Sequence, residues 1–210
     1  FLGISNHRLH VAHEAIDSGK FDTLQFPLNS LSSDKDLALI DACKAKEVGL
    51  IAMKGMSGGL ITKAATTFAF LRQYENVVPI WGIQRMEELE EFLDLDKNPP
   101  ALDQAMWKII EQDRKELSGG FCRACGYCMP CPVGIQIPTT ARIVLLMNRA
   151  PYQQFLTDTF KAQMDLIEDC QNCGQCKEKC PYELDTPELL KQNLRGYREL
   201  VKKYSQQGIH

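Results

Sequence analysis

One stretch of the chain reads Cys170-Gln-Asn-Cys173-Gly-Gln-Cys176-Lys-Glu-Lys-Cys180-Pro181. Three of its cysteines are spaced by two intervening residues, and the fourth stands directly before a proline. This spacing is typical of loops that bind a cubane 4Fe–4S cluster with three thiolates and send the fourth thiolate to another cluster. The stretch therefore predicts a cluster-binding loop from which Cys180 is directed away.

An upstream run repeats the pattern as Cys122-Arg-Ala-Cys125-Gly-Tyr-Cys128-Met-Pro-Cys131-Pro132, one residue shorter before its last cysteine. Gly126 and Gly174 stand at equivalent positions, where the missing Cβ would let backbone amides approach a cluster and donate hydrogen bonds to its sulfides. Crossed ligation then predicts two 4Fe–4S clusters. The first takes Cys122, Cys125, Cys128 and Cys180, and the second takes Cys170, Cys173, Cys176 and Cys131.

Two other uses of these cysteines are disfavoured by their arrangement. Zinc sites usually divide into two Cys-x-x-Cys pairs that are a dozen or more residues apart. Disulfide frameworks use even numbers of cysteines in oxidising compartments, whereas this chain has nine cysteines, eight of them in the two runs. The ninth, Cys43, lies on the apolar stripe of an expected helix and is predicted to be a buried structural thiol.

The composition of the chain argues against nucleic acid and membranes as binding partners. A net charge of −3 over 210 residues, with acidic and basic residues interleaved, does not favour binding to nucleic acid or to an anionic membrane surface. No apolar run approaches the 18 or so residues that a membrane span requires. No signal peptide is visible at Phe1–Ile4, so we expect a cytoplasmic location, where thiolates stay reduced.

Helical patterns surround the cysteine runs. The breaker Asn98-Pro99-Pro100 ends the preceding region, and Ala105–Leu117 has the pattern of an amphipathic connector. Helices are expected at Thr140–Met147, Tyr152–Ile167 and Pro187–Tyr204, without strand-like alternation between the runs. Residues 99–118 are thus predicted to be a connector helix and residues 119–210 an all-α, ferredoxin-like domain with two clusters.

The charges near the runs allow two interpretations. Arg123, Lys177 and Lys179 lie beside the predicted ligands. Positive charge there would favour the reduced form of a cluster and help an acidic electron carrier to dock. The alternative is that these side chains are ordinary solvated surface charges.

Residues 1–98 alternate between strand and helix patterns. The strand-like runs are Phe1–Ser5, Phe21–Leu28, Val48–Met53 and Val77–Trp81, each followed by a helical pattern, with Ser33 or Asp34 as a candidate cap. Repeated β/α units imply parallel strands covered by helices. Four such units correspond to half of a (β/α)₈ barrel or to a small doubly wound sheet, and the pattern alone does not choose between them.

Several motifs in this region follow the order of the later strands of a known family. They are Gly3-Ile-Ser5-Asn6-His7, Thr23-Leu-Gln25-Phe-Pro-Leu-Asn29, Gly49-Leu-Ile-Ala-Met53-Lys54-Gly-Met-Ser-Gly-Gly59 and Trp81-Gly82-Ile-Gln-Arg-Met-Glu87. Together with the cysteine module, they resemble the iron–sulfur-containing branch of the aldo/keto reductases. The resemblance covers the family's fifth strand to its last helix, at about residues 1–97. It implies an α/β plus all-α fold class, in which a partial (β/α)₈ TIM barrel of four C-terminal β/α units precedes the helical ferredoxin-like domain.

The resemblance also implies an NADP(H) site at the C-terminal ends of the strands. Ser5, Asn6 and Gln25 match positions that hold the nicotinamide carboxamide, and Met53 stands where many members stack an aromatic ring on the nicotinamide.

Two loops would contact the rest of the cofactor. The loop after the third strand would lie near the pyrophosphate, and the loop after the fourth would receive the adenosine phosphate. The matching residues are Lys54, Gly55 and Ser57 in the former, and Gly82, Gln84 and Arg85 in the latter.

The family's catalytic tetrad belongs to the first half of its barrel and has no counterpart here, so no catalytic residue is assigned. The chain begins partway through an expected strand, and we expect it to be part of a longer protein. The predicted function is an oxidoreductase in which electron transfer through the clusters is coupled to NAD(P)H-linked reduction of a small carbonyl substrate. The alternative is a non-catalytic electron-transfer subunit of a larger redox complex. In either case the expected partner is a one-electron carrier such as ferredoxin or flavodoxin.

Overall fold

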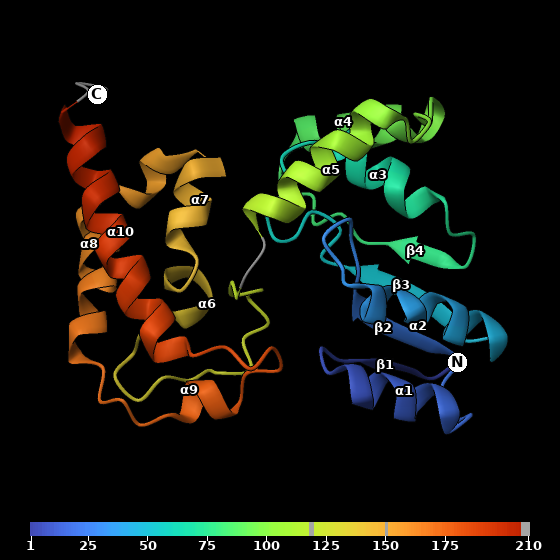
Figure 1. Cartoon of the computed structure of the whole chain (residues 1–210), viewed down its shortest axis with the longest axis horizontal. Helices are drawn as coiled ribbons and strands as arrows, with labels where there is room; N and C mark the ends of the chain where they lie inside the picture. Colours follow the sequence, from blue (N-terminus) through green and yellow to red (C-terminus); the bar gives the residue numbers. More distant parts are fainter. Residues whose placement is uncertain (118–119, 150, 207–210) are drawn as a thin grey trace. The chain divides into compact units, whose positions relative to one another are not determined.

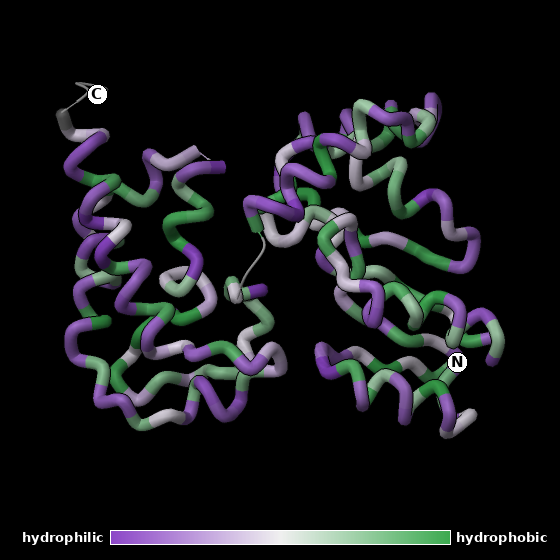
Figure 2. Tube along the Cα trace, in the orientation of Figure 1, coloured by the Kyte–Doolittle hydropathy of each residue, from purple (hydrophilic) through white to green (hydrophobic). Residues whose placement is uncertain are grey.

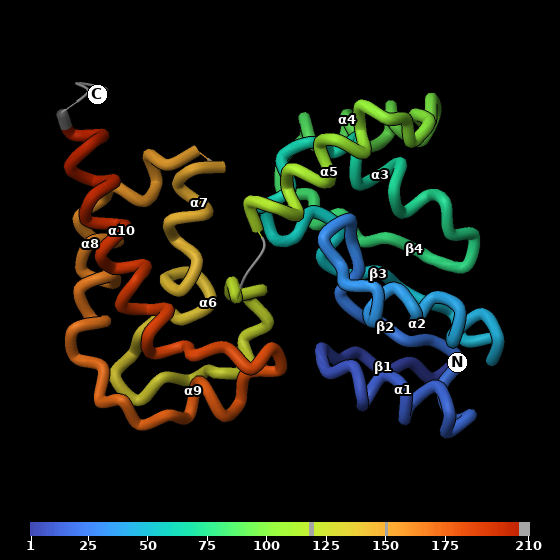
Figure 3. Tube along the Cα trace, viewed as in Figure 1, coloured from blue at the N-terminus to red at the C-terminus, as the bar shows by residue number. Residues whose placement is uncertain are grey.

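The computed structural model describes residues 1–117, 120–149 and 151–206. The chain divides into two compact units, Phe1–Ser118 and Gly119–His210, which are considered separately (Figures 1 and 3). The boundary predicted between residues 118 and 119 lies outside the described residues. Within the described part of the chain, no helix combines the length and the apolar character needed to cross a membrane.

The first unit is built on a parallel sheet with strand order β1-β2-β3-β4. Its strands are β1 (Gly3–Ser5), β2 (Thr23–Pro27), β3 (Gly49–Met53) and β4 (Val77–Pro79). The register pairs Gly3 with Thr23, Thr23 with Gly49 and Leu50 with Val77. The helices are α1 (Leu9–Asp17), α2 (Asp34–Ala45), α3 (Ala64–Arg72), α4 (Met86–Lys97) and α5 (Gln104–Glu116).

The core of this unit lies on one face of the sheet. Leu24, Phe26, Leu50 and Ala52 are each at most 3% exposed and pack with residues of the helices. Most of the alternate strand positions are exposed or half-buried, as at Ser5, whereas Met53 at the end of β3 is buried. Because consecutive strands are neighbours and right-handed crossovers all progress in one direction, every crossover helix falls on the same face.

The predicted partial (β/α)₈ barrel is wrong. The described residues contain four parallel strands in a small open sheet, and no eight-unit barrel is formed. The four strand–helix units could be predicted from the sequence because alternating strand and helix patterns specify parallel pairing and crossover helices. Closure depends instead on the number of strands and on their shear and tilt, which the local pattern does not contain.

Helix α2 of this unit is stabilised by its local sequence, and helix α5 by tertiary packing. Ser33 caps α2 as expected, accepting a hydrogen bond from the Asp36 amide, while the Asp36 side chain accepts one from the Ser33 amide. This reciprocal pair satisfies two donors at the helix start. Helix α5, predicted as a connector, packs into the first unit, where Ile110 is fully buried and Arg114 Nε donates to the Ser30 carbonyl at 2.7 Å.

The second unit is helical, with no strand among its described residues. Its elements are α6 (Ile137–Thr140), α7 (Ile143–Arg149), the 3₁₀ helix η1 (Tyr152–Phe155), α8 (Asp158–Asp165), the 3₁₀ helix η2 (Leu166–Asp169), α9 (Gln175–Glu178) and α10 (Thr186–Gln206).

Helix α10 organises this unit. Hydrophobic residues recur along it between hydrophilic ones (Figure 2), and Leu190, Leu194 and Tyr197 are buried. The Tyr197 hydroxyl donates to the Phe155 carbonyl at 2.7 Å. A Cβ on Gly196 would lie 2.7 Å from a Val144 methyl, so the glycine permits the close approach of α10 to α7.

Candidate metal centre

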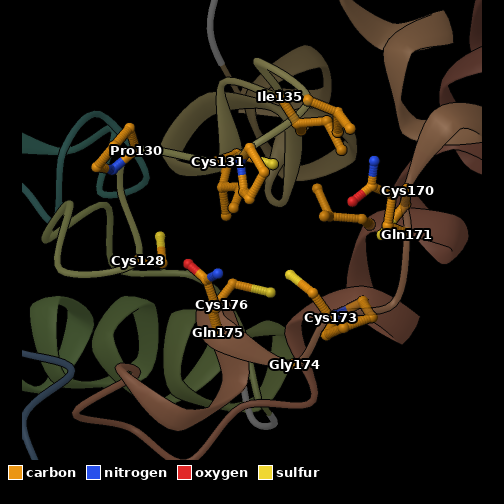
Figure 4. Close-up of a pocket in the computed structure, with 15 residues that line it drawn as sticks. Cys128, Pro130, Cys131, Ile135, Cys170, Gln171, Cys173, Gly174, Gln175 and Cys176 are labelled. Atoms are coloured by element: carbon orange, nitrogen blue, oxygen red, sulfur yellow. The ribbon is translucent and has the colours of Figure 1, made fainter.

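The eight cysteines of the two runs line two pockets in the second unit. The described residues that line the first pocket include Cys122, Cys125, Cys128 and Cys180. Those that line the second include Cys128, Cys131, Cys170, Cys173 and Cys176. In the second pocket, the sulfur atoms of Cys173 and Cys176 point toward one another (Figure 4).

The two runs share a backbone conformation that brings their thiols together. Ala124 and Asn172, each directly before the second cysteine of its run, have φ values of 51° and 49°. Gly126 and Gly174, each directly after that cysteine, have φ values of 81° and 76°. Two left-handed residues around one cysteine curl each loop, so thiols spaced by two residues face a common pocket.

The repeat continues past the last cysteine of each run. Gly134 and Glu183, each three residues after that cysteine, have φ values of 83° and 54°. Their amides donate to the carbonyls of Cys131 and Cys180 at 3.0 Å and 3.3 Å. The shorter spacing in the first run therefore leaves the turn after its last cysteine unchanged.

Burial raises the pKa of several of these thiols. It raises the pKa of Cys128 to about 12, with further contributions from Cys122 and Cys125. Burial also raises the pKa of Cys122 and that of Cys176. Because metal ligation requires thiolates, a bound metal would have to displace these protons, as metal centres do at coordinating thiols.

Backbone amides lie close to the sulfurs. The Ala124 amide donates to Cys122 Sγ at 3.4 Å, and the Lys177 amide lowers the pKa of Cys176 against the larger effect of burial. Such N–H···S contacts stabilise thiolate ligands and tune the potential of a cluster.

The donor set fits an iron–sulfur cluster, because cysteine thiolates are the ligands of 4Fe–4S clusters and each pocket is lined by at least four cysteines. All nine cysteines are free thiols, and eight of them surround two pockets that are otherwise mostly apolar.

The predicted basic residues have different environments. The Arg123 guanidinium lies 4.9 Å from the ring centroid of Phe121 and 4.4 Å from that of Tyr182. Lys177 forms an exposed ion pair with Asp185 at 2.7 Å, and Lys179 is exposed.

Sequence reasoning missed Arg142, between α6 and α7. Its charge acts on Cys122 and lowers the pKa of that thiol against burial. No spacing relates Arg142 to a cysteine run, so no local signal could have identified it. Tyr182, which lines the first pocket, stands two residues after Cys180 and could have been noticed.

Three of the residues matched to a nucleotide site come together in the first unit. Gln25 Nε2 donates to Ser5 Oγ at 3.4 Å and lies 3.6 Å from Met53 Sδ. The three residues lie at or near the carboxyl ends of β2, β1 and β3, which is the edge where parallel α/β sheets bind ligands.

Asn6, directly after β1, is 7% exposed. Its Oδ1 accepts from the Arg8 amide, whereas its Nδ2 has no hydrogen-bond partner among the described residues. Beside it, burial and the charge of Lys54 lower the pKa of His7 to about 4. Asn6 thus provides a buried donor that a ligand could satisfy.

The loop after β3 contains Lys54 and Ser57 in the left-handed region, with φ values of 63° and 50°. The Gly55 amide donates to the Ile80 carbonyl at 3.1 Å, and a Cβ on Gly55 would lie 2.7 Å from the Trp81 ring. Gly55 therefore permits contact between two loops, and its amide is already engaged.

The loop after β4 contains Gly82, Gln84 and Arg85 and folds onto the start of α4. Arg85 pairs with Glu88 through Nε at 3.0 Å and a terminal nitrogen at 2.9 Å. The Gln84 amide donates to the same carboxylate and is the main cause of its lowered pKa, followed by Arg85. The charge of Arg85 is thus partly neutralised within the loop.

Comparison with known proteins identifies one domain. Residues 121–185 match the family described as the 4Fe-4S dicluster domain. No curated protein and no solved structure matches the chain. The match spans both cysteine runs and identifies an iron–sulfur domain in the second unit.

Proposed function

We propose that the second unit is an electron-transfer domain that holds two 4Fe–4S clusters by crossed ligation. The first cluster would be held by Cys122, Cys125, Cys128 and Cys180, and the second by Cys170, Cys173, Cys176 and Cys131. The observation that carries the proposal is that each of these sets of four lines a single pocket, although one member of each set comes from the other run.

When bound, 4Fe–4S clusters supply one-electron carriers whose potentials depend on charge and hydrogen bonds at the sulfurs. The chain would contribute the eight thiolates, the amides beside Gly126 and Gly174, and two mostly apolar pockets that limit access of water. Cys128 lines both pockets, so the two sites are neighbours and an electron could pass between them. The partner would be a one-electron carrier such as ferredoxin or flavodoxin, or a subunit of a redox complex, in a reducing compartment such as the cytoplasm.

The test is the iron and acid-labile sulfide content of protein prepared without oxygen. We expect eight irons and eight sulfides per chain, with visible absorbance that bleaches on reduction. Cys43→Ser serves as the control, because Cys43 is buried in the first unit and should leave both contents unchanged. Bound zinc in place of iron would overturn the proposal.

Crossed ligation has its own test in Cys180→Ser and Cys131→Ser. Cys180→Ser should alter the electron paramagnetic resonance signal of the same cluster that Cys125→Ser alters. Cys131→Ser should alter the one that Cys173→Ser alters. The opposite pairing would show that each run holds its own cluster.

We further propose that the first unit binds NADP(H) for reduction of a small carbonyl substrate, as the resemblance to the aldo/keto reductases implies. The contacts among Ser5, Gln25 and Met53 support this, as does the buried, unsatisfied Nδ2 of Asn6. In a fluorescence titration with NADPH, Asn6→Ala should weaken binding several-fold, whereas Asn98→Ala, in the loop after α4, should not. If the unaltered chain fails to bind NADPH, the non-catalytic electron-transfer subunit becomes the better description.

A further inference from the structure

The two cysteine pockets differ in charge. Among the described residues that line the first pocket is one charged side chain, Arg123. The described lining of the second pocket contains no charged side chain; its polar members besides the cysteines are Gln171 and Gln175. Two sites with the same ligands therefore lie in different electrostatic surroundings.

Arg123 is held in place by residues that flank the two runs. Phe121 directly precedes the first run and Tyr182 directly follows the second, and their rings lie 4.9 Å and 4.4 Å from the guanidinium carbon. Both distances are within the range of cation–π attraction. The charge of Arg123 is thus fixed at the first pocket and cannot easily turn away into solvent.

Arg142 lines neither pocket as described, but its charge interacts with that of Cys122. It is half-buried between α6 and α7, and its Nε donates to the Pro138 carbonyl at 3.1 Å. Of the cysteines, Cys122 is the one whose charge acts on Arg142. Cys122 lines the first pocket and is absent from the lining of the second.

Near the second pocket, the available charges are compensated or negative. Lys177 is paired with the Asp185 carboxylate at 2.7 Å. Asp169 directly precedes Cys170, and Glu168 before it is paired with Arg198 at 2.7 Å. A cluster gains negative charge when it is reduced, so positive charge fixed in a water-poor pocket stabilises the reduced form.

We infer that Arg123 gives the first cysteine site a higher reduction potential than the second. A single electron taken from a one-electron donor, which is itself oxidised by one electron, would then reside at the first site. This inference rests on the proposed binding of two clusters. It assigns Arg123 as a residue that sets the direction of electron flow inside the domain.

The test is an anaerobic potentiometric titration of the full chain, followed by electron paramagnetic resonance. We expect two one-electron waves in the unaltered protein. Arg123→Gln should lower the higher wave and leave the lower one in place, with at least a tenfold fall in the ratio of reduced to oxidised protein at a fixed potential, which is about 59 mV for one electron. Arg123→Lys, which keeps the charge, should restore most of the difference.

Arg195→Gln is the matched control, because it removes an exposed charge on α10 in the same unit and lines neither pocket. A shift of the lower wave, no shift in either wave, or an equal shift in Arg195→Gln would overturn the inference. If Arg123→Gln binds less iron, Arg142→Gln replaces it with the same expectation, and loss of iron from both variants would assign these residues to assembly and overturn it as well. Unaltered protein without iron would instead contradict the proposed function.

Discussion

At the scale of single residues, glycines determine the shape of the cysteine loops. Gly126 and Gly174 have left-handed backbones, and a Cβ at either would meet no protein atom within 4 Å. Alanine there should therefore cost conformational energy of about 1–2 kcal/mol without a steric clash. We expect Gly126→Ala and Gly174→Ala each to lower the midpoint of thermal bleaching of the visible absorbance.

The neighbouring residue supplies the control. Ala124 already occupies the left-handed region with a Cβ, so Ala124→Gly removes strain that Gly126→Ala introduces. Glycine also makes the unfolded chain more flexible, which offsets about 0.4–1 kcal/mol of that gain. Ala124→Gly should leave the bleaching midpoint unchanged or raise it, and a decrease equal to that of Gly126→Ala would contradict the role of backbone strain.

A second prediction at this scale concerns His7. Its pKa is lowered from 6.5 to about 4, first by burial and then by Lys54, so the unfolded chain binds the proton more readily. The stabilising contribution is therefore complete above pH 6.5 and is lost as the pH falls toward 4, by at most about 1.4 kcal/mol per pH unit. Urea unfolding followed by tryptophan fluorescence reports on the first unit, because Trp81 and Trp107 both lie there.

His7→Gln is the matched variant, since glutamine stays neutral across this range. Its stability should fall less steeply than that of the unaltered protein between pH 6.5 and 4. Parallel curves for the two proteins would mean that His7 titrates normally in the folded state.

At the scale of elements, the crossing of α10 and α7 depends on the contact between Gly196 and Val144. Gly196→Ala would place a Cβ 2.7 Å from a methyl of a stiff β-branched side chain. Overpacking costs about 1–3 kcal/mol, and the better helix propensity of alanine returns about 1 kcal/mol. We expect a net loss of stability that Val144→Ala partly rescues in the double variant, whereas Glu199→Ala on the exposed side of α10 should be nearly neutral. Additive effects of the two substitutions would rule out a direct clash.

Helices and strands were predicted correctly from the sequence where neighbouring residues determine them. The patterns at Phe21–Leu28 and Val48–Met53 correspond to β2 and β3, with ends shifted by at most two residues. The single helix expected at Thr140–Met147 is instead broken into α6 and α7. At the break, Asn193 Nδ2 donates to the Ala141 carbonyl and its Oδ1 accepts from the Val144 amide. A side chain about 50 positions away thus binds the backbone groups at the break, which no window of local sequence could reveal.

The same distinction applies to the candidate site. The cysteines could be proposed as ligands from the sequence because ligand spacing within a loop is a local property. The effect of Arg142 on Cys122 depends on how α6 and α7 pack, and the engagement of the Gly55 amide by Ile80 depends on contact between two loops. Tertiary contacts of this kind decide which of the matched residues are available to a ligand.

At the scale of the whole molecule, each of the two units has its own buried apolar side chains among the described residues. The first unit has its core on one face of the β-sheet, and the second packs α10 on α6 and α7 around residues such as Ile137, Ile143 and Leu190. The second core is small, and its loops would be held together by thiolate ligation. Metal binding is then a large part of the folding free energy of that unit.

Removal of iron should therefore unfold the second unit and leave the first one folded. Treatment with a chelator and a mild oxidant should abolish the visible absorbance and much of the helical circular dichroism. The urea midpoint followed by fluorescence of Trp81 and Trp107 should stay the same, because both residues belong to the first unit. The chelator without oxidant, which leaves clusters in place, is the control. A lower urea midpoint after iron loss would mean that the first unit depends on the second for its stability, and that the two cores fold as one cooperative structure.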